Sequence, residues 1–543
     1  MQKAIERGQA GILFGFATFV LGTLANATPQ SPDVIVYDVG VNGSDLNDIA
    51  YYGQNGGIAA YSIATQSCNS GTEPVDWFDS GGDTRHPVIG QNMFRLANGR
   101  FEQIGQSWLK HGFCAVNEIE AFCAPCSATN CDTLGIGCAD TYWATLNDGG
   151  GGRSKRFVNA TLGSHVESGI APSGNATIRG RLQVAVADID PALNPGAEYF
   201  IEGHYVTADD AAAGNSSNNA TWRRVVVNSV SNVDGGGNSH RVFPGIFAWQ
   251  DMDPSVVIKV AMNPEVPGYK TAFYLAYRVT TAGPGTWHYE YAIQNLSSDQ
   301  SAGSYTVPVP PGVIVTNIGF HDVAYHSGDP YDGTDWPGVR NAGDVNWATT
   351  PFGTNANANA IRWGTLYNFR FDTNSPPTTG SVDIGLFKTG PLSSLTVNDV
   401  LVPSANPIAF DKFRTHGDPN GSGSVVAPFV STRNGGHINP QIFFQEAAAI
   451  VGQTWKGRVD THEASMLLVS MAGADDGRIT RMGELLIRTP FTRHLTNDGL
   501  SLAIPSDPSL VGATFSAQAA TLSSDGWRLT NALDVTIGSA DAP

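Results

Sequence analysis

Charged residues are scarce in this chain of 543 residues, where Asp, Glu, Lys and Arg together make up only 15% and about a quarter is usual. The 49 acidic residues outnumber the 31 basic ones, so the formal net charge is −18. A phosphate backbone or an anionic lipid surface would repel such a chain. The one short basic segment, residues 153–156, has no aromatic residues interleaved with it. We therefore expect no nucleic-acid partner.

The common catalytic signatures are also missing. The sequence holds no G-x-S-x-G nucleophile elbow, no P-loop and no G-x-G-x-x-G turn. His462 begins the run His-Glu-Ala-Ser-Met, which departs from the zinc-protease pattern H-E-x-x-H at its last position. These absences weigh against serine hydrolases, nucleotide-binding enzymes and metalloproteases. They leave open whether the protein is an enzyme of another kind.

Long hydrophobic runs are missing after the first 27 residues. That segment predicts a secretory signal peptide, because Lys3 and Arg7 precede an apolar run over residues 12–24 and an A-x-A cleavage site at residues 25–27. The apolar run is shorter than the roughly 20 residues that cross a bilayer. We expect a mature protein that begins at Thr28, has no membrane span, and is secreted or associated with the cell surface.

Cysteines are few and confined to one quarter of the chain, at Cys68, Cys114, Cys123, Cys126, Cys131 and Cys138. The last four follow the spacing C-x2-C-x4-C-x6-C, which would also suit a zinc or iron–sulfur site. An exported chain meets oxidising conditions, and an even number of cysteines favours disulfides. We expect three disulfides, with a pairing that the sequence does not determine. A redox pair at Cys123 and Cys126 is the lesser alternative, since no βαβ pattern surrounds it.

Short alternating strands fill the remaining sequence, whereas helical patterns are scarce. In residues 286–294, for example, Trp287, Tyr289 and Tyr291 fall on one face of a strand, and His288 and Glu290 fall on the other. Antiparallel sheets packed as sandwiches bury such faces. We therefore predict an all-β fold of several antiparallel β-sandwiches.

The domain organisation follows from the cysteines and from a glycine-rich segment. The expected order is a signal peptide at 1–27, a disulfide-stapled β region at 28–175, a β-sandwich domain at 176–410, a linker at 411–435, and a small immunoglobulin-like β-sandwich at 436–543. The stapled region need not fold alone and is a candidate for one half of a larger sandwich.

Residues 86–111 are the most informative stretch, and they predict a β-hairpin that turns at Asn98-Gly99. Asn-Gly is the strongest short hairpin signal, because a type I′ turn needs a positive φ at both central residues. A two-residue loop places Arg95 opposite Glu102, which makes a favourable cross-strand charge pair.

The same register, continued without interruption, brings His86 opposite His111 at the open end of the hairpin. Two imidazoles directly across a strand pair can share a metal ion or a substrate hydrogen bond. A bulge at Pro87 or Gly105 would break this pairing. The plain alternative is two ordinary polar residues where the hairpin frays.

The loop after the strand expected at 313–320 is the richest polar cluster. It collects His321, Asp322, His326, Asp329, Asp332 and Asp335. Aspartates at three-residue spacing in a glycine-rich loop can wrap a calcium ion, whereas two imidazoles with a carboxylate would suit zinc, copper or iron. Calcium is the favoured cofactor and a transition metal is the less favoured one. The plain alternative is a turn-rich loop whose aspartates make only Asx-turns.

Two further kinds of site need weighing. Trp336, Trp347 and Tyr331 lie among Asn, Asp and Gly, a mixture that stacks on sugar rings and bonds their hydroxyls, although aromatic packing between sheets explains them equally well. The histidine–carboxylate couples on single strand faces, His204 with Glu202 and His288 with Glu290, could each supply an oriented base. Alternation places such couples on a solvated sheet face just as readily.

Three segments carry a resemblance to a group of proteins: the hairpin through Cys114, the run Arg-Trp-Gly-Thr-Leu-Tyr-Asn-Phe-Arg-Phe at 362–371, and the ending Thr-Asn-Ala-Leu-Asp-Val-Thr-Ile-Gly at 530–538. They resemble large exported bacterial β-sandwich proteins of unassigned function. The resemblance implies secretion and a β-sandwich build, and it transfers no catalytic residue. The first hypothesis is a non-catalytic protein of the cell surface or extracellular matrix that binds calcium and glycan. The alternative is an extracellular enzyme that acts on polysaccharide, or a metal-dependent oxidoreductase.

Overall fold

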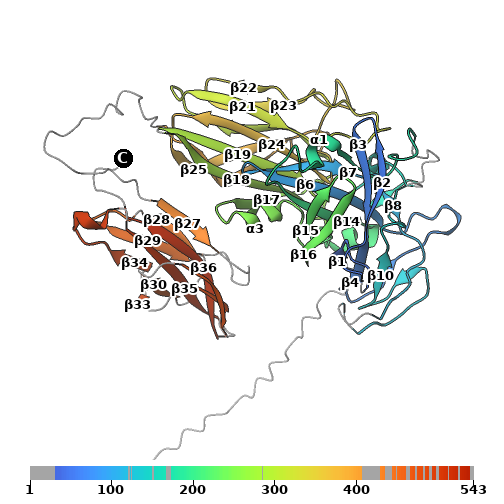
Figure 1. The fold of residues 1–543 in the computed structure, drawn as a ribbon, viewed down its shortest axis with the longest axis horizontal. Coiled ribbons are helices and arrows are strands. Elements are labelled where there is room, and N and C mark those ends of the chain that lie inside the picture. Colours follow the sequence, from blue (N-terminus) through green and yellow to red (C-terminus); the bar gives the residue numbers. More distant parts are fainter. Residues whose placement is uncertain are drawn as a thin grey trace, which may run out of the picture.

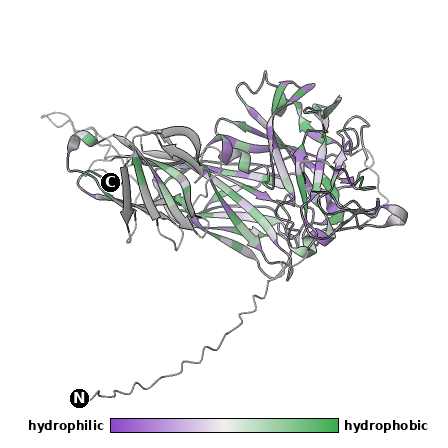
Figure 2. Cartoon of the chain, turned by 90° about the horizontal axis from the view of Figure 1, so that it is seen from below, coloured by the Kyte–Doolittle hydropathy of each residue, from purple (hydrophilic) through white to green (hydrophobic). Residues whose placement is uncertain are grey.

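The computed structural model describes residues 31–405, apart from 44, 120–122, 124, 150–151, 167–172 and 284, and, with short gaps, residues 429–537. The described chain is almost entirely antiparallel β-structure, as predicted (Figure 1). Apolar and polar residues are interspersed along the strands (Figure 2). None of the described helices is long and apolar enough to cross a membrane. The expected signal peptide lies outside the described residues.

A nine-stranded sheet forms the centre of the larger part of the molecule. Its strands, in spatial order, are β16 (Asn232–His240), β15 (Ala220–Ser229), β14 (Glu198–Val206), β6 (Val88–Ala97), β7 (Arg100–Gln106), β13 (Leu182–Ala185), β3 (Ile58–Ile63) and β2 (Ile49–Asn55), and β8 (Lys110–His111) pairs with β6. Strands from both sides of residue 175 therefore share one sheet. The disulfide-stapled region is half of a larger β-structure rather than a separate unit.

Both faces of this sheet are buried along its central strands. Along β14, Tyr199 and Ile201 point into a core shared with β1 (Val34–Val39), whereas Phe200 between them points into a second core with Phe94 and Trp222. This alternation explains why β14 is buried along nearly its whole length. The first core is closed by a small sheet of β1, β4 (Thr65–Asn69) and β10 (Ala139–Tyr142).

A five-stranded sheet closes the second core, and its central strands are buried on both faces. It contains β17 (Val257–Asn263), β18 (Thr271–Gly283), β19 (Thr286–Asn295), β24 (Thr365–Thr373) and β21 (Val315–His321). On β18, Ala272 and Tyr274 face the second core, whereas Phe273 and Leu275 face a third. The third core lies against another five-stranded sheet of β22 (Gly338–Arg340), β23 (Asp344–Ala348), β20 (Ala302–Pro308), β25 (Pro377–Leu386) and β26 (Ser394–Pro403).

Helices are short, as expected. In the part of the chain that the structure describes, they are α1 (Val186–Ile189), α2 (Ala208–Ala213) and α3 (Phe247–Met252). Gly214 ends α2 in the left-handed conformation, with a φ of 80°, which glycine adopts without steric cost.

The C-terminal unit has one core between two antiparallel sheets. One sheet holds β27 (Phe429–Arg433), β36 (Gly526–Thr536), β35 (Thr514–Ser523), β30 (Ser465–Ser470) and β33 (Thr492–Thr496), and the other holds β28 (Phe443–Ala447), β29 (Thr454–Val459) and β34 (Leu500–Ala503). Trp455 and Phe515 pack edge to face within that core. Strand β27 falls inside the segment expected to be a linker, so this unit begins earlier than predicted. Most of the expected linker lies outside the described residues.

The six cysteines form three disulfides, Cys68–Cys123, Cys114–Cys131 and Cys126–Cys138, and none is free. The prediction of three disulfides is confirmed, and no cysteine is left to bind zinc or an iron–sulfur cluster. Cys68 lies on β4 and is buried. Cys68–Cys123 fastens the loop that follows β8 onto β4, Cys126–Cys138 fastens it to the residue before β10, and Cys114–Cys131 closes the loop on itself. Disulfides of this number are typical of proteins outside the cytoplasm.

Candidate metal centre

The hairpin that leads to this site turns where the sequence predicts. Asn98 and Gly99 have φ values of 53° and 78°, as a type I′ turn requires. Arg95 pairs with Glu102 across the strands, and their side chains form an ion pair at 2.8 Å.

Farther from the turn the predicted register is wrong. A bulge between Phe94 and Met93 makes Met93 face Gly105, and at the open end His111 pairs with Val88 instead of His86. The cause is a neighbouring strand. A Cβ at Gly105 would lie 2.6 Å from the carbonyl oxygen of Gln183, so glycine lets β13 approach at the bulge.

The imidazoles of His86 and His111 nevertheless meet, and a third histidine joins them. His86 Nε2 lies 3.0 Å from His111 Nδ1. His165 ends the short strand β12 (Ser164–His165), which pairs with β11 (Val158–Asn159). Its ring centroid is 4.7 Å from that of His86 and 4.8 Å from that of His111. One nitrogen of each ring lies within 4.8 Å of the other two.

Backbone carbonyls orient two of these rings. His86 Nδ1 lies 2.7 Å from the carbonyl oxygen of Phe78, and His165 Nε2 lies 3.3 Å from that of His86. When His86 donates through Nδ1, its Nε2 lone pair is directed at the other two rings. Metal-binding histidines are usually held in this way, with one nitrogen on a backbone carbonyl and the other on the ion. His86 and His165 are buried, with 3% and 6% exposure.

The surroundings of His111 favour its neutral imidazole. Burial and, to a smaller extent, the neighbouring His165, His86, Arg153 and Lys110 together lower the pKa of His111 to about 3. A neutral imidazole is the form that binds metal ions. His111 therefore presents a nitrogen lone pair at neutral pH.

The residues present fit a transition metal. Zinc binds imidazole nitrogens at about 2.0–2.1 Å, so two ligands on one ion lie roughly 4 Å or less apart. The cluster, with all three nitrogens within 4.8 Å, needs to close only slightly. In the part of the chain that the structure describes, no carboxylate or thiolate completes the set. Three imidazoles with an open position suit zinc or copper better than calcium, which prefers oxygen ligands.

The polar side chains of the loop after β21 do not approach one another as the three histidines do. Asp322 accepts a hydrogen bond from Asn359, and Asp329 accepts one from Trp108 Nε1 at 3.1 Å. Asp332 accepts hydrogen bonds from the backbone and the hydroxyl of Thr334, as an Asx-turn does. Asp335 is exposed. The described residues show no metal-binding cluster that includes these carboxylates.

The two histidines of that loop are also apart from the cluster. His326 is buried with its ring centroid 5.1 Å from that of Trp108, and its Nδ1 lies 2.7 Å from the carbonyl oxygen of Ser327. His321 ends β21, where burial lowers its pKa while the nearby Glu102 raises it. Neither belongs to the three-histidine group.

Most of the aromatic residues predicted to stack on sugars lie in a hydrophobic core. Trp336 and Trp347 are 1% and 0% exposed and pack in the third core, so their proposed stacking on sugars is wrong. Each faces inward because the sheets on both sides supply apolar partners. Tyr331 differs, since it is only partly buried and lines a cleft.

The two histidine–carboxylate couples lie in different environments. Glu202 is fully buried and accepts hydrogen bonds from Asn92, Gly245 and Gln294. His204 is buried too, at 1% exposure, so this couple does not lie on a solvated face. His288 lies 2.6 Å from Asp372 and 3.1 Å from Glu290, and both contacts raise its pKa.

Comparison with known proteins adds little. No family model and no curated protein matches the chain. Among solved structures, the native conformation of E. coli alpha-2-macroglobulin aligns with 94% of this chain and 24% of its own length at 7% identity, with a TM-score of 0.13.

Proposed function

We propose that this protein works outside the cytoplasm as a transition-metal-binding protein, with zinc or copper held by His86, His111 and His165. The observation that carries the proposal is the approach of three imidazoles, two buried and one partly buried, with one nitrogen of each within 4.8 Å of the others. The three disulfides support an oxidising location.

The number of ligands supports a reactive rather than a purely structural ion. Structural zinc sites are closed by four protein ligands, whereas catalytic sites have three and keep one position for water or substrate. An ion held by three neutral imidazoles keeps its full positive charge and would polarise whatever occupies that position. The protein orients two of the rings, because the carbonyl oxygen of Phe78 lies beside His86 Nδ1 and that of His86 lies beside His165 Nε2.

Metal analysis of the purified protein tests the proposal. The chain is exported into an oxidising compartment, purified without chelator, incubated with zinc or copper, dialysed, and analysed by inductively coupled plasma mass spectrometry. We expect about one ion per chain, lost in the double variant His86→Ala, His111→Ala. The matched control is His288→Ala, which removes a histidine that lies outside the cluster and should keep the ion. Substoichiometric metal in the unaltered protein, or retention by the double variant, would reject the proposal.

A further inference from the structure

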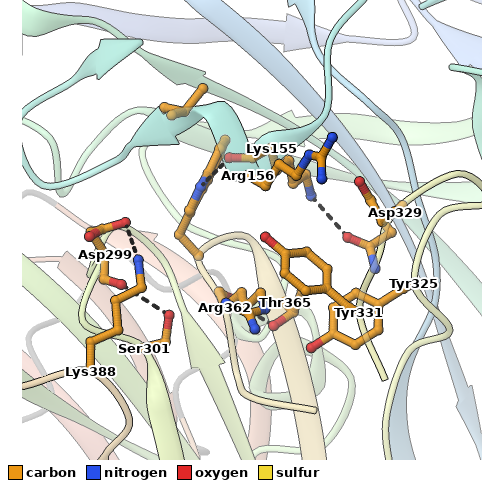
Figure 3. A pocket seen from close by; sticks show the side chains of 13 residues that line it. Lys155, Arg156, Asp299, Ser301, Tyr325, Asp329, Tyr331, Arg362, Thr365 and Lys388 are labelled. Carbon is orange, nitrogen blue, oxygen red and sulfur yellow. Dashed lines mark hydrogen bonds and ion pairs between the residues drawn. The ribbon is translucent and has the colours of Figure 1, made fainter. Parts of the chain in front are cut away.

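A cleft away from the histidine cluster gathers side chains from distant parts of the chain (Figure 3). Lys155 and Arg156 come from the 3-10 turn η2 (Lys155–Phe157), and Arg362 lies just before β24. Tyr331 and Lys388 line other parts of its wall. Figure 3 shows these side chains arranged around one common space.

Positive charge exceeds negative charge in this cleft. Four cationic side chains line it, Lys155, Arg156, Arg362 and Lys388, against two carboxylates, Asp299 and Asp329. The excess stands out in a chain whose net charge is −18. A cleft lined by one sign of charge concentrates ligands of the opposite sign. The cleft therefore favours an anion.

Three of these cations form no ion pair with a described carboxylate. Lys388 forms an ion pair with Asp299 at 2.8 Å. Within the described ranges no ion pair involves Lys155, Arg156 or Arg362. These three charges are available to a bound anion.

Among these three cations, Lys155 gives the strongest indication of a bound anion. It is only 9% exposed, yet its Nζ contacts just neutral oxygens, at 3.3 Å on Asn92 and 3.4 Å on Gln106 and Gly364. Burial lowers its pKa to about 8. The carboxylates of Glu202 and Asp329 offset this burial only in part and make no ion pair with Lys155. A buried ammonium that contacts no countercharge is costly, and a bound anion would remove much of that cost.

Arg362 is fixed in place with part of its donor set unused. Its guanidinium lies 3.7 Å above the ring of Tyr331 and donates through one amino group to the carbonyl oxygens of Ala356 and Ala358, at 3.1 Å each. Its Nε is buried and has no hydrogen-bond partner. Arginine held rigidly on an aromatic ring is suited to bind a carboxylate or phosphate.

The other groups of the cleft select among anions. Asp299 and Asp329 would repel a phosphate dianion more strongly than a singly charged carboxylate, and both can accept hydrogen bonds from sugar hydroxyls. Ser301, Thr365 and Tyr331 add hydroxyl groups to the lining. The cleft is open and has a volume of about 40 Å³, room for only a few water molecules, which fits a carboxylate group rather than a whole sugar ring. We propose that the cleft binds the carboxylate of an acidic sugar, a uronate, with the sugar ring at its mouth beside Tyr331.

Calorimetric titration of the full protein with glucuronate tests this, with glucose, acetate and glucose 6-phosphate as the comparison ligands. We expect glucuronate to bind most tightly and its affinity to fall as salt is raised. Arg156→Ala should weaken glucuronate binding about tenfold or more, since charge-assisted hydrogen bonds to carboxylate are strong. Arg156 is exposed and stacks on Phe157 alone, so its removal should leave the melting temperature unchanged.

Two more variants make the test specific. Arg362→Lys keeps the charge but loses the planar group on Tyr331, and it should also weaken binding. Arg224→Ala removes a surface arginine outside the cleft that pairs with Glu198, and it should have no effect. Tighter binding of glucose 6-phosphate, equal binding of acetate, no binding of glucuronate, or full affinity in Arg156→Ala would each overturn the proposal. None of these results depends on the metal.

Discussion

His86 Nε2 lies 3.0 Å from His111 Nδ1, although His111 is paired with Val88 across the strands. The bulge beside Gly105 displaces the backbone register, and the side chain of His86, which precedes β6, still reaches the ring on β8. The contact therefore depends on the bulge and on the position of β8.

Gly105→Ala tests whether the bulge needs glycine where β13 approaches it. The added Cβ would lie 2.6 Å from the carbonyl oxygen of Gln183 and 2.6 Å from Val184 Cγ2, so β13 or the bulge must move. We expect a loss of about 1–3 kcal/mol in the free energy of unfolding, as overpacking usually gives, measured by urea denaturation. Gly343→Ala is the control, because a Cβ there meets nothing within 4 Å. An equal effect at both positions would contradict the role assigned to Gly105.

Metal binding at the histidine cluster should stabilise the folded state. An ion that binds only the folded chain adds about 2.7 kcal/mol at a concentration one hundred times its dissociation constant. Zinc or copper should therefore raise the melting temperature, and a chelator should reverse the rise. The rise should disappear in His165→Ala and persist in His288→Ala, as followed by differential scanning calorimetry. A rise of the same size in His165→Ala would assign the stabilising ion to another site.

Local signals in the sequence predicted much of the fold. The Asn98-Gly99 turn and the strands on either side of it follow from residue types within a few positions. The alternating pattern of β19 likewise follows from its own residues. Such features need no knowledge of the neighbouring strands, so they can be predicted from one sequence.

Features set by distant segments could not be predicted. The sequence marks Gly105 as a candidate bulge site, but whether a bulge forms there depends on the approach of Gln183, which lies far along the chain. His165 was missed for the same reason, because it is separated from His111 by more than the whole disulfide-linked loop and has no ligand spacing around it. The burial of Trp336 depends on sheets that pack on both of its sides. Only a three-dimensional arrangement shows these relationships.

Trp336 should contribute to stability rather than to sugar binding. It is 1% exposed, stacks near Phe320 with centroids 5.6 Å apart, and donates from Nε1 to the carbonyl oxygen of Asn359 at 2.6 Å. Trp336→Ala should cost about 3–5 kcal/mol, seen as a lower urea midpoint. Trp336→Phe should cost less and should leave glucuronate affinity unchanged. Loss of affinity in a fully folded Trp336→Phe protein would return this residue to the binding site.

Asp210 should make stability depend on pH. It is fully buried, and burial raises its pKa to about 8, with a smaller rise from Asp33 and Asp209. In the unfolded chain the same group titrates near 4. Between about pH 4 and pH 8 the folded state therefore keeps a proton that the unfolded state has released. Stability should fall as pH rises through this window, by at most about 1.4 kcal/mol per pH unit, and the contribution of the protonated group is lost above it.

Asp210→Asn should remove most of that dependence. The carboxylate accepts from Val34 N at 2.9 Å and from Asn219 Nδ2 at 2.7 Å. Asn219 Oδ1 has no partner, so rotation of the Asn219 amide lets it accept from a new amide at position 210. Urea denaturation between pH 5 and pH 8, with chelator present to exclude metal binding, should show a shallower fall for the variant. Part of the slope should remain, because burial also raises the pKa of Asp140, to about 7. The exposed Asp383→Asn is the control. A slope as steep in Asp210→Asn as in the unaltered protein would show that Asp210 is ionised throughout this range in the folded state.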